Sequence, residues 1–279
     1  MTLRTLGARL ATFAFCAAIA IAPLAACSNN AGPTAGNAEQ EAADEAQAQG
    51  AWILAKETYH TEDADHSVYE SVYTYTIDEH GNQTGVTVTT VGDDYEQSYM
   101  VNYELDDQGS CVAMTANYGE GDEEPISFTY EYDDQGRVIK RSASNDQIET
   151  YVYDEQGNII EQDLEFTIVD KDGTTTNKSM TTYDANGFCT KRSYESAGET
   201  WNYLYTYELG ENGLPVTGTG TDETTGATTQ YSFEYDKDGN LSKVTSNTDG
   251  AIETTTLEWT MVADASADAA AQNRLKMFV

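Results

Sequence analysis

The stretch Tyr151-Val152-Tyr153-Asp154-Glu155-Gln156-Gly157-Asn158-Ile159 contains the pattern that decides the fold. Two tyrosines at alternate positions lead into an Asp-x-x-Gly segment, and an apolar residue follows the glycine by two positions. Alternate side chains of a β-strand share one face, whereas Asp and Gly are favoured in a type I turn closed by a left-handed residue. The stretch therefore predicts a strand, a tight turn and the start of a returning strand.

The same pattern recurs through most of the chain. Its turn glycines are Gly81, Gly109, Gly136, Gly157, Gly187, Gly213 and Gly239. Aspartate stands three residues before all but one of them, at Asp78, Asp106, Asp133, Asp154, Asp184 and Asp236. The exception is Gly213, where Gly210 takes that place. Repetition at a nearly regular spacing indicates one supersecondary unit used many times, which we expect to be a β-hairpin.

Apolar and polar residues alternate before each turn. Tyr73 and Tyr75, for example, alternate with Thr74 and Thr76. This alternation is typical of antiparallel strands with one buried and one wet face. The pattern predicts an all-β protein, an antiparallel meander of roughly 14–16 strands made from repeated hairpins over residues 51–262. Such a sheet must curl or fold over to bury its aromatic face as a core, and a barrel, a coil and a sandwich all do so.

The motif Tyr-x-Tyr-Asp-x-x-Gly-Asn resembles the YD repeats of the bacterial RHS and wall-associated protein families. Its closest copies are Tyr130 to Val138, Tyr151 to Ile159 and Phe233 to Leu241. The resemblance implies long β-hairpin ribbons that wrap into shells outside the cell. It also implies one candidate function, a repeat shell fragment that shields a partner protein.

The N-terminus resembles the leader of a bacterial lipoprotein. Arg4 and Arg9 precede an uncharged, mostly apolar stretch that ends in the lipobox-like Leu24-Ala25-Ala26-Cys27. The resemblance implies a signal peptide over residues 1–26 and a diacylglyceryl group on Cys27, which anchors the chain outside the cytoplasm to the bacterial cell membrane. Residues 27–50 are poor in large apolar side chains and are expected to form a flexible tether. The Ala-rich tail, residues 263–279, is compatible with a short helix.

Charge limits the partners of this chain. Asp and Glu number 48 against 14 Lys and Arg, which gives a formal net charge of −34. A surface of this charge repels nucleic acid and anionic headgroups, so we expect no nucleic-acid partner and membrane contact only through lipid on Cys27. An envelope or host glycan, or another surface protein, remains a candidate partner. No cofactor is expected, although the acidic turns would permit weak Ca²⁺ binding.

One short segment concentrates potential metal ligands. His60, Asp63, Asp65 and His66 lie within seven residues of each other in an expected turn. Imidazole and carboxylate groups together can hold a divalent cation, so these four residues form a candidate metal site. A solvated polar turn is the alternative interpretation.

The repeat domain contains two cysteines. Cys111 and Cys189 each follow a turn glycine by two residues, so they occupy equivalent positions in different repeats. Their expected strands are far apart in a meander, whereas a disulfide requires Cα atoms roughly 4.4–6.8 Å apart. We therefore expect two buried free thiols.

Motifs for catalysis are lacking, and we do not expect an enzyme. The sequence contains neither a Gly-x-Ser-x-Gly nucleophile elbow nor a glycine-rich phosphate loop. The leading hypothesis is a membrane-anchored lipoprotein whose repeat sheet is a binding or structural module. The alternative is an enzyme or small-molecule carrier with a site inside the curled sheet. A transmembrane barrel also has alternating strands, but the polar face and the charge argue against it.

Overall fold

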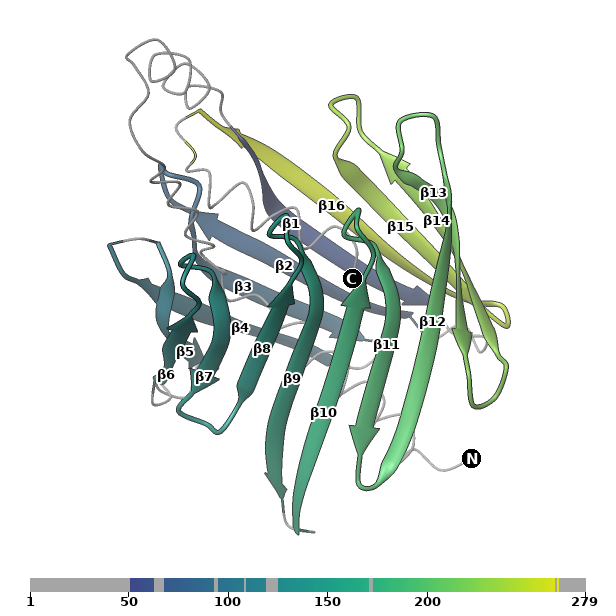
Figure 1. Cartoon of the computed structure of the whole chain (residues 1–279). Helices are drawn as coiled ribbons and strands as arrows, with labels where there is room; N and C mark the ends of the chain where they lie inside the picture. The colour runs from purple at the N-terminus through teal and green to yellow at the C-terminus, as the bar shows by residue number, and fades with distance from the viewer. Residues whose placement is uncertain are drawn as a thin grey trace.

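The computed structural model describes residues 51–62, 68–92, 95–107, 109–118, 125–170, 173–263 and 265. They form sixteen strands: β1 (Ala51–Glu62), β2 (Val68–Ile77), β3 (Gln83–Gly92), β4 (Tyr95–Leu105), β5 (Cys111–Asn117), β6 (Ile126–Tyr132), β7 (Val138–Ala143), β8 (Ile148–Tyr153), β9 (Ile159–Asp170), β10 (Gly173–Tyr183), β11 (Cys189–Ser196), β12 (Glu199–Leu209), β13 (Pro215–Asp222), β14 (Thr228–Tyr235), β15 (Leu241–Thr248) and β16 (Ala251–Val262). Each strand pairs antiparallel with the next, and β1 pairs with β16, so the sheet closes into a barrel (Figure 1). The predicted all-β meander is confirmed, and its closed form is a barrel.

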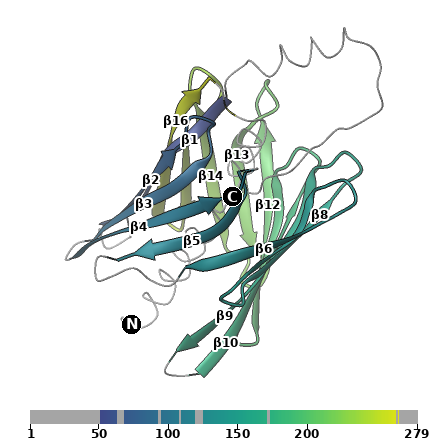
Figure 2. The same ribbon diagram turned by 90° about the vertical axis from the view of Figure 1, so that its left-hand side faces the viewer.

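Two opposed walls make up most of this barrel. Figure 2 shows β1 to β4 on one side and β8 to β10 on the other. The junction between β5 and β6 is short among the described residues, where its register contains the pairs Ala113–Ser127 and Met114–Ile126. In the described ranges, no helix has the length and hydropathy needed to cross a membrane. The leader and the tether lie outside those ranges, as does the tail apart from residues 263 and 265.

The Asp-x-x-Gly segments form the predicted turns. In the turn that follows Tyr153, the Asp154 carboxylate accepts the backbone N–H groups of Gln156 at 2.9 Å and Asn158 at 2.8 Å. The Asn158 side chain donates to the same carboxylate at 2.9 Å, which explains the asparagine after the glycine. Gly157 has a φ of 89°, in the left-handed region that glycine enters without strain. The hairpin shifts register beyond this turn, between Val152 and Tyr153, as a bulged turn requires.

The remaining aspartate turns use the same backbone bonds. Such bonds are formed at Asp78, Asp106, Asp133, Asp184 and Asp236. The exceptional turn keeps the backbone geometry without the aspartate: Gly210 donates to the Leu214 carbonyl at 2.8 Å, and Asn212 accepts the Leu214 N–H at 3.1 Å. The strand after this turn, β13, continues to Asp222. The segment alternates threonine with glycine, and that alternation suits a strand with a glycine face.

Protonation of the turn aspartates should weaken the fold. Hydrogen bonds from Asn158 and nearby backbone N–H groups lower the pKa of Asp154. Because the folded pKa lies below the unfolded value of about 3.9, the stabilisation is complete above that value and is lost as pH falls through the folded pKa. We expect the thermal midpoint, followed by circular dichroism, to drop as pH falls below about 4. Asp154→Asn should reduce this acid sensitivity more than Glu155→Gln, which removes an exposed charge from the same turn; equal effects would contradict the assignment.

On most strands, the inward positions carry aromatic and aliphatic side chains, and the outward positions carry mainly hydroxyl and charged ones. On β2, Tyr73 and Tyr75 are each 6% exposed, whereas Thr74 and Thr76 are exposed. The main buried cluster lies against β1 to β6 and comprises Leu54, Tyr73, Tyr75, Val86, Val88, Val101, Tyr103, Cys111 and Phe128. The prediction that the alternating tyrosines share the hidden face is confirmed for these strands.

Inward aromatic side chains also tie neighbouring repeats together. Tyr153 donates its hydroxyl to the Val138 carbonyl at 2.7 Å, and Tyr235 donates to the Pro215 carbonyl at 2.9 Å. Tyr130 and Trp259 make the corresponding bonds to the carbonyls of Cys111 and Leu241. Each acceptor is the residue two positions after a turn glycine. The motif therefore needs tyrosine rather than phenylalanine for a polar contact between one hairpin and the next.

Removal of these hydroxyls should destabilise the barrel by a modest, additive amount. Tyr153→Phe and Tyr235→Phe each leave a partly buried carbonyl without its donor, which should cost about 1 kcal/mol of unfolding free energy. The sites are separated along the barrel wall, so the double variant should lose the sum of the two. Urea unfolding followed by fluorescence measures this. Variants as stable as the parent protein would show that the bonds are replaced by water.

The outer wall carries cross-strand ion pairs. Lys140 lies 2.7 Å from Glu131, and Lys243 lies 3.1 Å from Glu234. Similar pairs join Lys56 to Glu258 and Lys178 to Glu165. The outer wall also exposes apolar side chains, among them Val152 and Leu204.

Candidate functional site

The inner wall differs between the two halves of the barrel. Along β2 to β4, the inward residues Tyr73, Tyr75 and Tyr103 are buried, whereas Tyr99 on β4 and Tyr130 on β6 are half-buried. Along β12 and β14, the inward aromatic residues Tyr205, Tyr207, Tyr231 and Phe233 are only half-buried. Because these rings point to the inside of a closed sheet, their residual exposure means that this half of the interior is not packed solid. We call these four residues the aromatic platform.

Two glycines of β13 make the aromatic platform possible. Gly218 and Gly220 stand at inward positions: Gly218 pairs in register with Tyr207 on β12 and Tyr231 on β14, and Gly220 pairs with Tyr205 on β12. A Cβ atom on Gly220 would lie 3.2 Å from the rings of both Tyr205 and Tyr231. On Gly218 it would lie 3.1 Å from the ring of Tyr207. The missing side chains therefore leave room for rings from β12 and β14 to meet over β13.

The platform rings are in contact with one another. The centroids of Tyr205 and Tyr231 are 6.3 Å apart, and those of Tyr207 and Phe233 are 6.0 Å apart. Tyr231 and Phe233 are stacked at 6.5 Å along β14. These distances are typical of favourable aromatic pairs. The result is a continuous aromatic surface that presents ring faces and phenol hydroxyls to the interior.

A cationic side chain borders the aromatic platform on β11. Asn177 on β10, which is 2% exposed and accepts the Tyr194 hydroxyl at 3.0 Å, lies farther along the same wall, because its partner Ser196 pairs with Glu199, six residues from Tyr205. Arg192 is half-buried and pairs in register with Thr181 on one side and Tyr203 on the other, so its side chain shares the inner wall with them. Aromatic faces bordered by a few oriented polar groups are the usual composition of small-molecule sites. The arrangement can bind a ring-shaped polar ligand, and the hydroxyls supply no activated nucleophile.

The packed half of the interior contains a buried ion pair. Arg141 on β7 and Glu149 on β8 form it, with 2% and 4% of their side chains exposed. Burial disfavours the charge of Arg141, but the Glu149 carboxylate raises the pKa of the guanidinium overall. The guanidinium also lies 5.1 Å from the centroid of the Phe128 ring. Because its charges are neutralised and sealed from water, this pair is a structural element.

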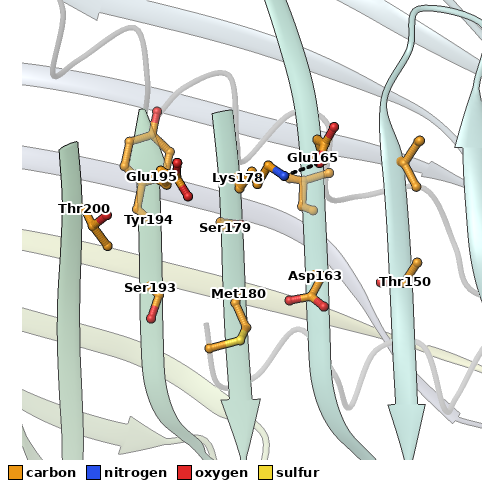
Figure 3. A pocket seen from close by; sticks show the side chains of 12 residues that line it. Thr150, Asp163, Glu165, Lys178, Ser179, Met180, Ser193, Tyr194, Glu195 and Thr200 are labelled. Atoms are coloured by element: carbon orange, nitrogen blue, oxygen red, sulfur yellow. Dashed lines mark ion pairs between the residues drawn. The ribbon is translucent and has the colours of Figure 1, made fainter. Parts of the chain in front are cut away.

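A shallow groove of about 460 Å³ lies on the outside of β8 to β12. Figure 3 shows Asp163 and Met180 at its centre and the Lys178–Glu165 ion pair above them. Burial raises the pKa of Asp163. The lining otherwise consists mainly of threonine, serine and glutamate side chains without a converging set of aromatic rings. We regard the aromatic platform as the better candidate site.

The predicted metal cluster is only partly described. His60 lies on β1, with its Nδ1 atom 3.7 Å from Glu70 on β2. Asp63, Asp65 and His66 lie outside the described residues, and the four-residue site stays a prediction. Among the residues that the structure describes, no group of three or more His, Cys, Asp or Glu side chains could hold a metal ion. At the turns, carboxylates such as that of Asp154 accept backbone N–H groups, so turn geometry accounts for the motif; weak Ca²⁺ binding stays a prediction.

The two cysteines of the barrel are free and buried, as expected from the repeat. Cys111 begins β5 and Cys189 begins β11, so six strand steps separate them. Burial raises the pKa of the Cys111 thiol to about 11. Both thiols are therefore inert core groups rather than nucleophiles.

Comparisons with known proteins give no family assignment. No protein-family model and no curated protein matches the chain. Among solved structures, a porin-like protein from Bacteroides uniformis is 14% identical, with a TM-score of 0.42 over 75% of this chain and 97% of that one. A porin-like protein from Bacteroides vulgatus is 10% identical, with a TM-score of 0.34 over 75% and 98%. The TcdB2-TccC3-TEV structure is 15% identical, with a TM-score of 0.26 over 68% of this chain and 13% of that one.

Proposed function

We propose that this protein is a membrane-anchored extracytoplasmic lipoprotein whose barrel is a binding module for glycans. The aromatic platform is the observation that carries the binding function: four half-buried rings on the inner wall, bordered by hydroxyl and guanidinium groups. Aromatic side chains offer an apolar face together with a polar edge, which suits a sugar ring. The site lies inside the curled sheet, as in the carrier alternative considered from the sequence.

Support for anchoring comes from the leader and from the outer wall. The lipobox-like end at Cys27 implies a lipid anchor, and the outer wall carries threonine, glutamate and lysine at strand positions that would face lipid in a membrane barrel. A tethered barrel with water on its outside fits both observations.

The binding proposal can be tested with a glycan array and two matched variants. Gly220→Val places a branched side chain against the rings of Tyr205 and Tyr231, whereas Thr219→Val changes the adjacent outward position. We expect Gly220→Val to weaken binding of the array's best ligand at least tenfold, and Thr219→Val to leave it unchanged. Tyr231→Ala should reproduce the loss. If no glycan binds, or if all variants bind equally, glycan binding at the platform is wrong.

Anchoring is tested separately by metabolic labelling with palmitate in a bacterium that processes lipoproteins. The parent chain should incorporate label and sediment with membranes. Cys27→Ser should lose both properties. A labelled Cys27→Ser variant, or an unlabelled parent chain, would contradict the anchor.

A further inference from the structure

The inward aromatic residues of β12 continue beyond the aromatic platform. Trp201 and Tyr203 stand at alternate positions before Tyr205 and Tyr207, and all four are half-buried. We call these four residues the aromatic track. At about 3.3 Å per residue, the track runs roughly 20 Å along the strand from Trp201 to Tyr207. It is therefore longer than a single sugar ring needs.

A second aromatic pair occupies the far end of the aromatic track. Tyr194 on β11 pairs in register with Trp201, and their ring centroids are 5.6 Å apart. The Tyr194 hydroxyl donates to the Asn177 side chain at 3.0 Å, and Asn177 is 2% exposed. This bond to a buried amide holds the Tyr194 ring in place. The pair is thus a preformed aromatic surface, separate from the aromatic platform.

The middle of the aromatic track lies between charges of both signs. Tyr203 pairs in register with Arg192 on β11 and with Asp222 on β13. Elsewhere on the inner wall, Glu57 and Glu253 each accept a hydrogen bond from a neighbouring hydroxyl. Because positive and negative groups both border the track, net charge gives no basis for selecting an acidic or a basic ligand. Contacts between rings are the feature that the two aromatic surfaces share.

We propose that the inner-wall site takes a linear, neutral oligosaccharide along the aromatic track, with one sugar ring on the aromatic platform and another on the Tyr194–Trp201 pair; this inference rests on the proposed glycan-binding function. Trp201 and Tyr205 are four residues apart, or roughly 13 Å along the strand, so one sugar ring cannot contact both. A short glycan should use the platform alone. A longer one should gain affinity from the second pair, because its rings are already linked.

The test measures how affinity depends on chain length. The probes are the cello-, malto-, xylo- and chito-oligosaccharide series, from disaccharide to hexasaccharide, with the last fully N-acetylated so that all are neutral. By titration calorimetry, the parent protein should bind the hexasaccharide of its preferred series at least tenfold more tightly than the disaccharide. Trp201→Ala should remove most of this gain and leave disaccharide binding unchanged, whereas Trp201→Phe should keep part of the gain. Leu204→Ala is the matched control, because it truncates an exposed outward side chain of the same strand, and the gain should persist.

The outcomes separate this inference from the proposed function. Equal affinity of the parent protein for short and long chains overturns the inference and leaves glycan binding at the platform in place. A folded Trp201→Ala variant that keeps the full gain, or that loses short and long chains equally, overturns it as well. Absence of binding to all four series overturns the inference, and the glycan array then decides the proposed function. The chain-length comparison on the parent protein needs no variant, so it stands even if Trp201→Ala does not fold.

Discussion

Replacement of Arg141 by methionine should destabilise the barrel by roughly 3–5 kcal/mol, because it strands a charge in the interior. Its partner Glu149 has only 4% of its side chain exposed, so water cannot solvate the carboxylate that remains. Methionine is a fitting replacement, since Met114 occupies the equivalent position, five residues after a turn glycine, in another repeat. Guanidinium-chloride unfolding followed by fluorescence gives the free-energy change.

The double variant Arg141→Met with Glu149→Leu is the control for this result. It removes both charges and replaces them with apolar side chains, which is often neutral or stabilising for a buried pair. We expect it to recover most of the stability lost in Arg141→Met. A double variant as unstable as the single one would show that the loss comes from packing around Phe128 rather than from the stranded charge.

Truncation of a leucine should cost far more stability on the inner face of the sheet than on the outer face. Leu241 begins β15 and is 1% exposed, whereas Leu204 on β12 is 39% exposed on the outer wall. Leu241→Ala removes buried methyl groups and leaves a cavity, so the expected loss of unfolding free energy is roughly 2–5 kcal/mol. Leu204→Ala should change it by about 0.5 kcal/mol or less. The measurement is equilibrium urea unfolding of the two variants beside the parent protein.

Equal losses in the two leucine variants would mean that the inner and outer walls are assigned wrongly. The comparison is sharp because the substitution is identical and only the face of the sheet differs. It also checks the central assumption of the platform, namely that residues in phase with Leu241 face the interior.

The hairpin repeat was readable from the sequence because its signals are local. Asp154 and Gly157 satisfy a turn through bonds within five residues, and the alternation of Tyr73 and Tyr75 with threonine identifies the buried face without knowledge of distant strands. The repeat also placed Cys111 and Cys189 at equivalent, separated positions, and both are free thiols.

The candidate site was missed because it depends on non-local pairing. The repeat pattern gives Gly218 and Gly220 no role, and only their pairing with β12 and β14 shows that they lie beneath the platform rings. Two glycines at alternate positions, flanked by outward threonines, were the available signal. The position of Arg192 beside Tyr203 likewise depends on the register between β11 and β12. Closure could not be predicted either, since alternation fixes which face is buried but not how a sheet meets itself.

The pairing of β1 with β16 links the first and last segments of the repeat domain. While the chain is being synthesised, β1 lacks its partner β16 until the strand that ends at Val262 has emerged. Contacts of such long sequence separation form late and slowly. The growing polypeptide therefore stays open, with an unpaired strand edge, throughout synthesis. A chain that lacks β16 should keep this open form, with an edge that can pair with other chains.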